Sequence, residues 1–324
     1  MAFISFNFTF DIKDGMEFTW NGAKGIVNDQ ELVLGETGMS LAAVAETLAR
    51  PERLIIALRD GAQVPQELHK RINEGVLVLN ILTNDSLKIK RHIDRFASAI
   101  AARMHKEQLD AAGQTAAFRS TLCPYCQATI NLTGFAETAY FYCPYCESLY
   151  LTGGALISKG DDYCVCDECE MFGRVQEYKI FYFYFLLVVY GWRSQQRCLC
   201  DGCARSALLK ALLINLIFIL GVPVALWGLM RSYMGQDPRF EQLLEANDYA
   251  RDGSPDLAGN LYQAMSGKNP MNPAFAMNKA LGHLHLNDAN GAVQSLSTAL
   301  TSCSNYIPAI RILQRIAPPE QRAQ

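Results

Sequence analysis

Cysteine spacing constrains this chain of 324 residues more than any other feature. Of its 11 cysteines, all but Cys303 lie between Cys123 and Cys203, and most of them form C-x-x-C pairs. Disulfide frameworks space their cysteines irregularly through small secreted domains, whereas C-x-x-C turns are typical of thiolates that bind a metal ion. The N-terminal segment lacks the basic and long apolar stretches of a signal peptide. We therefore expect reduced cysteines that bind metal.

The segment 121–152 holds the first two pairs, each of which reads Cys-Pro-Tyr-Cys. Residues between the pairs alternate as in strands, so we expect a hairpin that brings the pairs together as a zinc ribbon. The predicted zinc ligands are Cys123, Cys126, Cys143 and Cys146. Because four thiolates leave no open coordination position, the ion would be structural and would supply much of the folding free energy of this module.

Cys-Pro-Tyr-Cys pairs are also compatible with two other chemistries. The motif serves disulfide exchange in glutaredoxins, where a cysteine at a helix N-terminus has a lowered pKa. Here it occurs twice within 24 residues, and no complete βαβ unit fits between the copies, so a thiol-redox protein is the alternative function. A rubredoxin-like iron site is a further alternative, although Gln127 and Glu147 stand where such sites usually have glycine.

The segment 161–205 holds two further pairs, and each is preceded two residues earlier by an additional cysteine. Zinc takes four ligands, so two of these six thiols are in excess. The C-x-x-C turns favour as ligands Cys166, Cys169, Cys200 and Cys203. Replacement of one of them by Cys164 or Cys198 is left open. The cofactors expected are thus two structural Zn²⁺ ions per chain.

An apolar, aromatic insert, residues 180–192, separates the pairs of the second ribbon. Its 13 residues are too few for a membrane-spanning helix, which needs about 20. The two pairs, the aromatic strand Phe181–Tyr190 and the basic residues Arg193 and Arg197 resemble LITAF-type domains and the membrane-linked zinc ribbons of bacteria. This resemblance implies that the insert contacts a membrane; an ordinary buried strand is the alternative.

Residues 208–230 are predicted to form a transmembrane helix. From Ala211 to Met230 the sequence has no charged residue, and these 20 residues are enough to cross a bilayer. Trp227 and Tyr233 suit a membrane interface. More basic residues precede the span than follow it, so we expect a single-pass membrane protein with cytoplasmic ribbons and an extracytoplasmic C-terminus.

Residues 1–117 are predicted to form an α+β domain. Strand-like alternation is seen at Ile4, Phe6, Phe8 and Phe10. Further strands are expected at Met16–Trp20, Gly25–Val27, Glu31–Leu34, Arg53–Leu58 and Val76–Leu79. A helix capped by Asp85 and Ser86 follows them. Strands closed by a C-terminal helix resemble the pleckstrin-homology-like fold, which implies a lipid- or peptide-binding module; a folded domain with another partner is the alternative.

Residues 238–317 repeat with an offset of 34 residues. The positions that align are Ala246 with Ala280, Ala250 with Leu284, Ala258 with Ala292, Tyr262 with Leu296 and Met265 with Ala299. Small residues recur where antiparallel helices approach closely, and the period and pattern resemble tetratricopeptide repeats. The resemblance implies a groove for an unknown protein partner. Because such arrays usually need three or more repeats, self-association as a homo-oligomer or packing on another module is a further expectation.

The predicted fold class is therefore multidomain α+β, with a β-rich N-terminal domain, two zinc ribbons, one transmembrane helix and helical repeats. This layout resembles bacterial zinc-ribbon membrane proteins. The net charge of −3 gives no basic field for nucleic acid, and no phosphate loop, H-E-x-x-H motif or nucleophile elbow indicates an enzyme. We expect a membrane-anchored adaptor without catalytic activity, which uses structural zinc and recruits a protein through its repeats.

Overall fold

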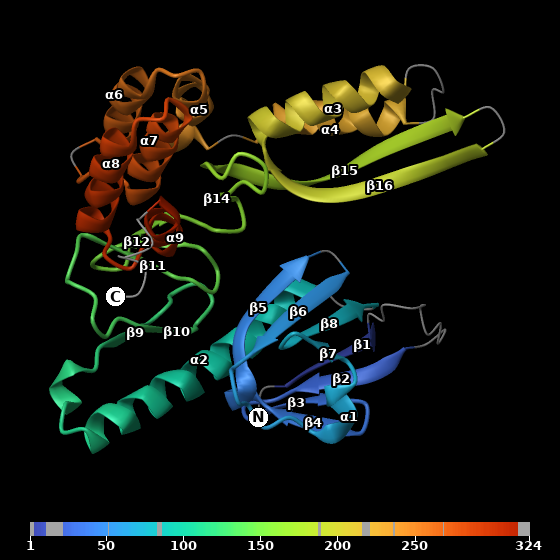
Figure 1. Cartoon of the computed structure of the whole chain (residues 1–324), viewed down its shortest axis with the longest axis vertical. Coiled ribbons are helices and arrows are strands. Elements are labelled where there is room, and N and C mark those ends of the chain that lie inside the picture. Colours follow the sequence, from blue (N-terminus) through green and yellow to red (C-terminus); the bar gives the residue numbers. More distant parts are fainter. Residues whose placement is uncertain are drawn as a thin grey trace. The chain divides into compact units, whose positions relative to one another are not determined.

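The computed structural model divides after Gly134 into two units, residues 1–134 and residues 135–324. It describes residues 3–10, 22–50, 52–82, 86–186, 189–215, 221–235, 237–267 and 269–316, and for residues 181–195 it describes the backbone alone. The expected strand Met16–Trp20 and the capping residue Asp85 lie outside the described residues. The first unit is rich in strands, and the second ends in an array of helices (Figure 1).

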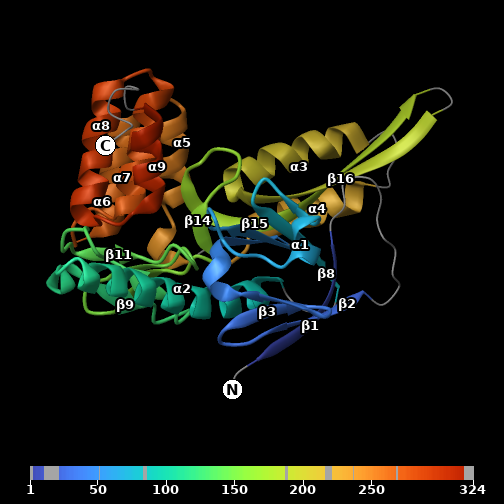
Figure 2. The same cartoon turned by 60° about the horizontal axis from the view of Figure 1, so that its bottom comes forward.

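An antiparallel sheet forms the N-terminal unit (Figure 2). Its strands are β1 (Ile4–Phe10), β2 (Ala23–Val27), β3 (Glu31–Leu34), β4 (Thr37–Ser40), β5 (Val44–Arg50), β6 (Arg53–Leu58), β7 (Ile72–Asn73) and β8 (Val76–Ile81). They lie in the order β4-β3-β2-β1-β8-β6-β5, and β7 pairs with β8. The expected alternation in β1 is confirmed, because Phe6 and Phe8 are buried. Phe6 pairs with Gly25, where a Cβ atom would come within 2.4 Å of the Phe6 ring.

The helix α2 (Ser86–Ala111) covers this sheet with its first half. Ile89 and Ile93 are one helical turn apart and share a face, and both are fully buried in the same core as Leu54 and Leu79 of the sheet. Each fully buried side chain of this size contributes about 1.5–3 kcal/mol. The same helix also contacts the hairpin of β9 (Ser120–Leu122) and β10 (Thr129–Asn131), where Thr129 donates to the Ser98 hydroxyl. The remaining short helices of this unit are α1 (Gln66–His69), η1 (Leu41–Ala43) and η2 (Thr115–Ala117).

Two three-stranded sheets begin the second unit. The first contains β11 (Tyr140–Tyr142), β12 (Leu149–Leu151) and β13 (Leu156–Ser158), and the second contains β14 (Tyr163–Val165), β15 (Phe172–Leu186) and β16 (Val189–Cys200). The long hairpin of β15 and β16 carries the aromatic insert 180–192. Ile180 is buried, but the side chains of residues 181–192 lie outside the described ones. The choice between membrane contact and buried strand for the insert therefore stays a prediction.

The expected transmembrane helix at 208–230 is wrong. This stretch contains two short helices, α3 (Asp201–Asn215) and α4 (Val222–Ser232), which lie side by side and pack against β15 (Figure 1). Among the described residues, no helix combines the length and the apolar character needed to cross a membrane. The predicted fold class is corrected by removing the membrane span, and the predicted single-pass location with cytoplasmic ribbons and an extracytoplasmic C-terminus loses its basis.

Close contacts explain why the apolar stretch folds as two helices. Asn215 ends α3, and its side-chain amide donates to the carbonyl of Ala211 at 2.8 Å. Gly221, immediately before α4, leaves room for Asn215, since a Cβ atom there would lie 2.5 Å from the asparagine side chain. Gly228 likewise lets Leu208 of α3 approach α4. The absence of charged residues from 211 to 230 predicted one continuous helix, because hydropathy along the chain does not take contacts between distant residues into account.

The helical array packs closely around small residues. Its helices are α5 (Leu243–Arg251), α6 (Pro255–Ser266), α7 (Pro273–His285), α8 (Ala289–Ser302) and α9 (Ile307–Ile316), preceded by η3 (Pro238–Phe240). Ala246 and Ala280, which align at the offset of 34 residues, are both fully buried. At Gly282 a Cβ atom would lie 2.9 Å from the carbonyl oxygen of Ala250, so the glycine lets α7 approach α5.

Candidate metal centres

Three of the four C-x-x-C turns share one backbone pattern. In the first turn, the N–H of Gln127 donates to the carbonyl of Cys123, and the N–H of Cys123 donates to the carbonyl of Ala128, both at 2.9 Å. The turns that begin at Cys143 and Cys166 repeat both bonds. The residues that follow the second cysteine have φ angles of 60°, 58° and 57° and are Gln127, Glu147 and Glu170. The turn therefore forms without the usual glycine, at a cost of about 1–2 kcal/mol per residue in this conformation.

The first group contains the four ligands predicted for the first ribbon. The sulfur atoms all lie within 4.8 Å of one another, and all four residues are buried: Cys123, Cys126, Cys143 and Cys146. Four sulfurs placed tetrahedrally around Zn²⁺ at its usual bond length would be about 3.8 Å apart, so the group is close to the geometry that the ion needs. The Ser148 hydroxyl lies 3.3 Å from the sulfur of Cys146 and accepts the N–H of Gly160 at 3.1 Å.

The second group contains Cys166, Cys169, Cys200 and Cys203, whose sulfurs also lie within 4.8 Å of one another. The sulfurs of Cys169 and Cys200 are 3.7 Å apart. Cys166 Sγ accepts the backbone N–H of Glu168 at 3.4 Å and that of Cys200 at 3.2 Å. Hydrogen bonds from the neighbouring thiols of Cys169, Cys200 and Cys203 lower the pKa of Cys166. A thiolate at this position is the form that binds a metal ion.

The last turn of the second group opens a helix and contacts an arginine. Because α3 begins at Asp201, Cys203 lies in its first turn, where the helix dipole favours negative charge. Nη1 of Arg251, in α5, lies 3.7 Å from the sulfur of Cys203, and this guanidinium also pairs with Asp248. Four thiolates around Zn²⁺ leave a formal charge of about −2, which Arg251 partly offsets. Sequence analysis missed Arg251 because it lies 48 residues from Cys203.

Three cysteines lie outside both groups of the described chain, namely Cys164, Cys198 and Cys303. Burial raises the pKa of the Cys164 thiol well above its usual value. Burial also raises the pKa of the Cys303 thiol to about 12. The thiols of Cys164 and Cys303 are therefore protonated near neutral pH. Neither Cys164 nor Cys198 belongs to the second four-cysteine group, and the identity of the four zinc ligands stays a prediction.

Buried asparagines of the helical array hold strands of both ribbons. Asn278 of α7 accepts the N–H of Phe172 at 2.7 Å and donates to its carbonyl at 2.8 Å, and Asn247 of α5 donates to that carbonyl at 3.0 Å. Asn305 binds Tyr142 of β11 in the same way, at 3.0 Å and 2.8 Å. A neighbouring β-strand would make the same pair of bonds, so each amide takes the place of a strand. No sequence motif indicated these residues.

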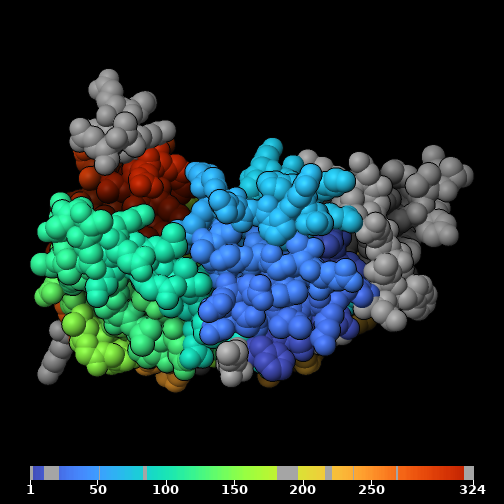
Figure 3. Space-filling view, turned by 90° about the horizontal axis from the view of Figure 1, so that it is seen from below, coloured from blue at the N-terminus to red at the C-terminus, as the bar shows by residue number. Residues whose placement is uncertain are grey.

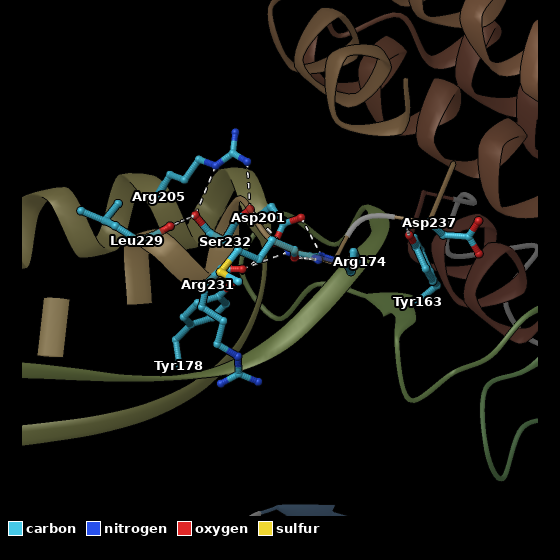
Figure 4. Close-up of polar contacts among 10 residues, drawn as sticks. Tyr163, Arg174, Tyr178, Asp201, Arg205, Leu229, Arg231, Ser232 and Asp237 are labelled. Carbon is cyan, nitrogen blue, oxygen red and sulfur yellow. Dashed lines mark hydrogen bonds and ion pairs between the residues drawn. The ribbon is translucent and has the colours of Figure 1, made fainter. Parts of the chain in front are cut away.

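A buried ion pair attaches α3 and α4 to the second ribbon (Figure 4). Nε and Nη2 of Arg174, in β15, each donate to one carboxylate oxygen of Asp201 at 2.9 Å. The same guanidinium donates to backbone carbonyls at the end of α4, those of Arg231, Ser232 and Met234. The cation thus lies at the C-terminus of α4 and the carboxylate at the N-terminus of α3, as the helix dipoles favour.

The donor sets define what the two groups can do. Each offers four sulfur atoms and no position for a substrate, which fits a structural ion, and an all-thiolate set suits zinc or iron. The chain therefore contains two four-cysteine groups that could hold metal ions. Comparison with protein-family models, with curated proteins and with solved structures finds no match, so the resemblances to LITAF-type ribbons, bacterial zinc-ribbon membrane proteins and tetratricopeptide repeats gain no support from it.

Proposed function

We propose that this chain is a scaffold protein without catalytic activity, which binds two structural zinc ions and mediates protein–protein interaction through the helices α5–α9. The observation that carries the proposal is the pair of closed four-cysteine groups. A metal ion surrounded by four thiolates stabilises a fold, because it has no free position at which a substrate could react.

The asparagines of the helical array support the interaction role. The side-chain amides of Asn278 and Asn305 bind the backbone of extended segments. These bonds do not depend on the side chains of the bound segment. Recognition of a partner's backbone in this manner is a common way to bind an extended peptide. In this chain the bound segments are its own ribbon strands, so we propose that ribbons and helices together form the surface that a partner protein contacts.

Metal analysis tests the structural role. The purified chain should contain about two zinc ions by mass spectrometry of the metals, and chelation should lower its thermal unfolding temperature. A Cys303→Ala variant should retain both ions, because that thiol lies outside both groups. Iron in place of zinc, or metal-free protein that reduces insulin disulfides catalytically, would instead support the thiol-redox alternative.

Affinity capture tests the interaction role. The zinc-loaded full chain would be the bait, and the matched control would be the Cys200→Ser chain, in which one metal group is broken. A partner should be enriched on the native bait and lost on the variant, and purified partner should bind the native chain in calorimetry. If the native bait retains no protein beyond those found on an unrelated bait of the same size, the scaffold proposal is wrong.

A further inference from the structure

A cavity of about 420 Å³ lies in the N-terminal unit where α2 meets the first C-x-x-C turn. This volume is in the range of small-molecule sites, about 300–1,000 Å³. Polar and aromatic side chains that line it are Lys88, Arg91, His92, Arg95, Tyr125 and Gln127, together with Cys126 of the first four-cysteine group. Phe3 and Ile4, at the start of the chain, add an apolar wall. Figure 3 shows the surface of this unit, with the residues of β1–β6 in blue and those of α2 in turquoise.

The cavity is strongly basic. Lys88, Arg91, His92 and Arg95 follow the spacing i, i+3, i+4 and i+7, which places them on one face of α2. Among the described residues, no acidic side chain lines the cavity. The acidic residue of this helix segment, Asp94, is buried elsewhere: it accepts a hydrogen bond from Lys90 at 2.6 Å and another from Thr47 of β5. The positive charge of Lys90 therefore balances the Asp94 carboxylate outside the cavity.

The wall opposite α2 is held in a fixed position. The guanidinium of Arg91 lies 4.9 Å from the ring centre of Tyr125. Beyond the turn, the N–H of Thr129 donates to the hydroxyl of Ser98 in α2 at 2.8 Å. Tyr125 itself stands between Cys123 and Cys126, which belong to the first four-cysteine group. The cavity is thus formed before any ligand arrives, and its affinity is not reduced by the cost of ordering these residues.

We propose that this cavity binds a small anion that carries two or more phosphate groups. Lys88 and Arg95 are exposed at its mouth, whereas Arg91 and His92 are half-buried within it. Guanidinium groups match the geometry of phosphate oxygens and form charge-assisted hydrogen bonds with them. A soluble phosphorylated molecule and a phosphorylated lipid headgroup share this chemistry. The inference does not depend on the scaffold function proposed above.

Calorimetric titration of the zinc-loaded full chain with inorganic pyrophosphate tests the site. The double variant Lys88→Glu with Arg95→Glu should weaken binding about tenfold or more, because two charge-assisted bonds are lost and repulsion replaces them. The matched control is Arg103→Glu with Lys106→Glu, which changes the net charge equally at exposed positions of α2 outside the cavity. It should change the dissociation constant by less than about twofold.

Vesicles distinguish the two sources of phosphate. Phosphatidylcholine vesicles with and without phosphatidylinositol bisphosphate would be sedimented with the native chain and both double variants. Retention that requires the phosphorylated lipid and is lost only in the Lys88→Glu, Arg95→Glu chain assigns a lipid headgroup; pyrophosphate binding without retention assigns a soluble ligand. The proposal is overturned if millimolar pyrophosphate does not bind, if both double variants weaken binding equally, or if only long nucleic acid binds.

Discussion

The two four-cysteine groups have the same ligands but are built differently. In the first group, each half is a turn that joins two short paired strands, β9 to β10 and β11 to β12. In the second group, one half is such a turn between β14 and β15, and the other half is the N-terminus of α3 at the far end of β16. The first group is therefore assembled from two local hairpins, whereas the second needs a long hairpin and a helix to be in place.

This difference shows that an identical donor set can depend on local or on distant contacts. Around the second group, Arg174 joins β15 to α3 and α4, Arg251 contacts Cys203 from α5, and Asn278 holds Phe172 from α7. At the first ribbon, long-range contacts join Thr129 to Ser98 of α2 and Tyr142 to Asn305, and neither of these two contacts involves a cysteine of the group. We therefore expect damage to the second group to spread further through the second unit.

Loss of a ligand should have the largest effect. Cys200→Ser and Cys143→Ser should each leave about one zinc ion per chain, since a structural zinc ion contributes about 10–16 kcal/mol of binding free energy in small zinc domains. Cys200→Ser should also lower the unfolding temperature more, because β14–β16, α3 and the helical array share contacts around that site. Metal analysis and thermal circular dichroism measure both effects. An equal fall of the unfolding temperature in both variants would contradict the proposal that damage spreads further from the second group than from the first.

Breaking the buried ion pair should rank second. Arg174→Met leaves the Asp201 carboxylate buried without its cation, which should lower the free energy of unfolding by about 3–5 kcal/mol. The matched control is Arg315→Met, because Arg315 pairs with Glu170 at the surface, where an ion pair contributes about 0.5 kcal/mol. Urea unfolding compares the two. Similar losses would mean that the Arg174 pair does not hold α3 and α4 to the ribbon.

Removing a strand-binding asparagine should have a smaller effect. Asn305→Ala leaves both the N–H and the carbonyl of Tyr142 without this partner, so we expect a loss of about 3 kcal/mol. Asn278→Ala should cost about 2 kcal/mol, because Asn247 still donates to the carbonyl of Phe172. The exposed Asn290→Ala is the control and should stay within about 0.5 kcal/mol. If Asn278→Ala lowers the free energy of unfolding more than Asn305→Ala does, the expected order of these two contacts is wrong.

Changing the arginine beside the second group should have the smallest effect. Arg251→Gln removes about 1 kcal/mol of electrostatic stabilisation from the thiolates, so a chelator should extract the second zinc ion about fivefold faster. The rate for the first ion should not change, which serves as an internal control. A coloured chelator resolves the two phases. Equal acceleration of both phases would show that Arg251 does not act through Cys203.

Much of the local structure could be predicted from the sequence. The expected strands Glu31–Leu34 and Arg53–Leu58 coincide with β3 and β6, and the helix with Ile89 and Ile93 on one face is α2. These elements follow from alternation and helical spacing, which are properties of neighbouring residues. The apolar stretch 208–230 was interpreted wrongly because its break depends on Asn215 and Leu208 meeting glycines further along the chain.

The sequence by itself determined three of the four C-x-x-C turns, because each of these turns closes through hydrogen bonds within six consecutive residues, as from Cys123 to Ala128. Only the tertiary structure decided what surrounds them: the Arg251 guanidinium beside Cys203, the asparagines that replace a strand, and the pairing of Arg174 with Asp201. These contacts join residues tens of positions apart, and their energies come from burial and charge in the folded chain. The spacing of residues along the chain therefore does not predict these contacts.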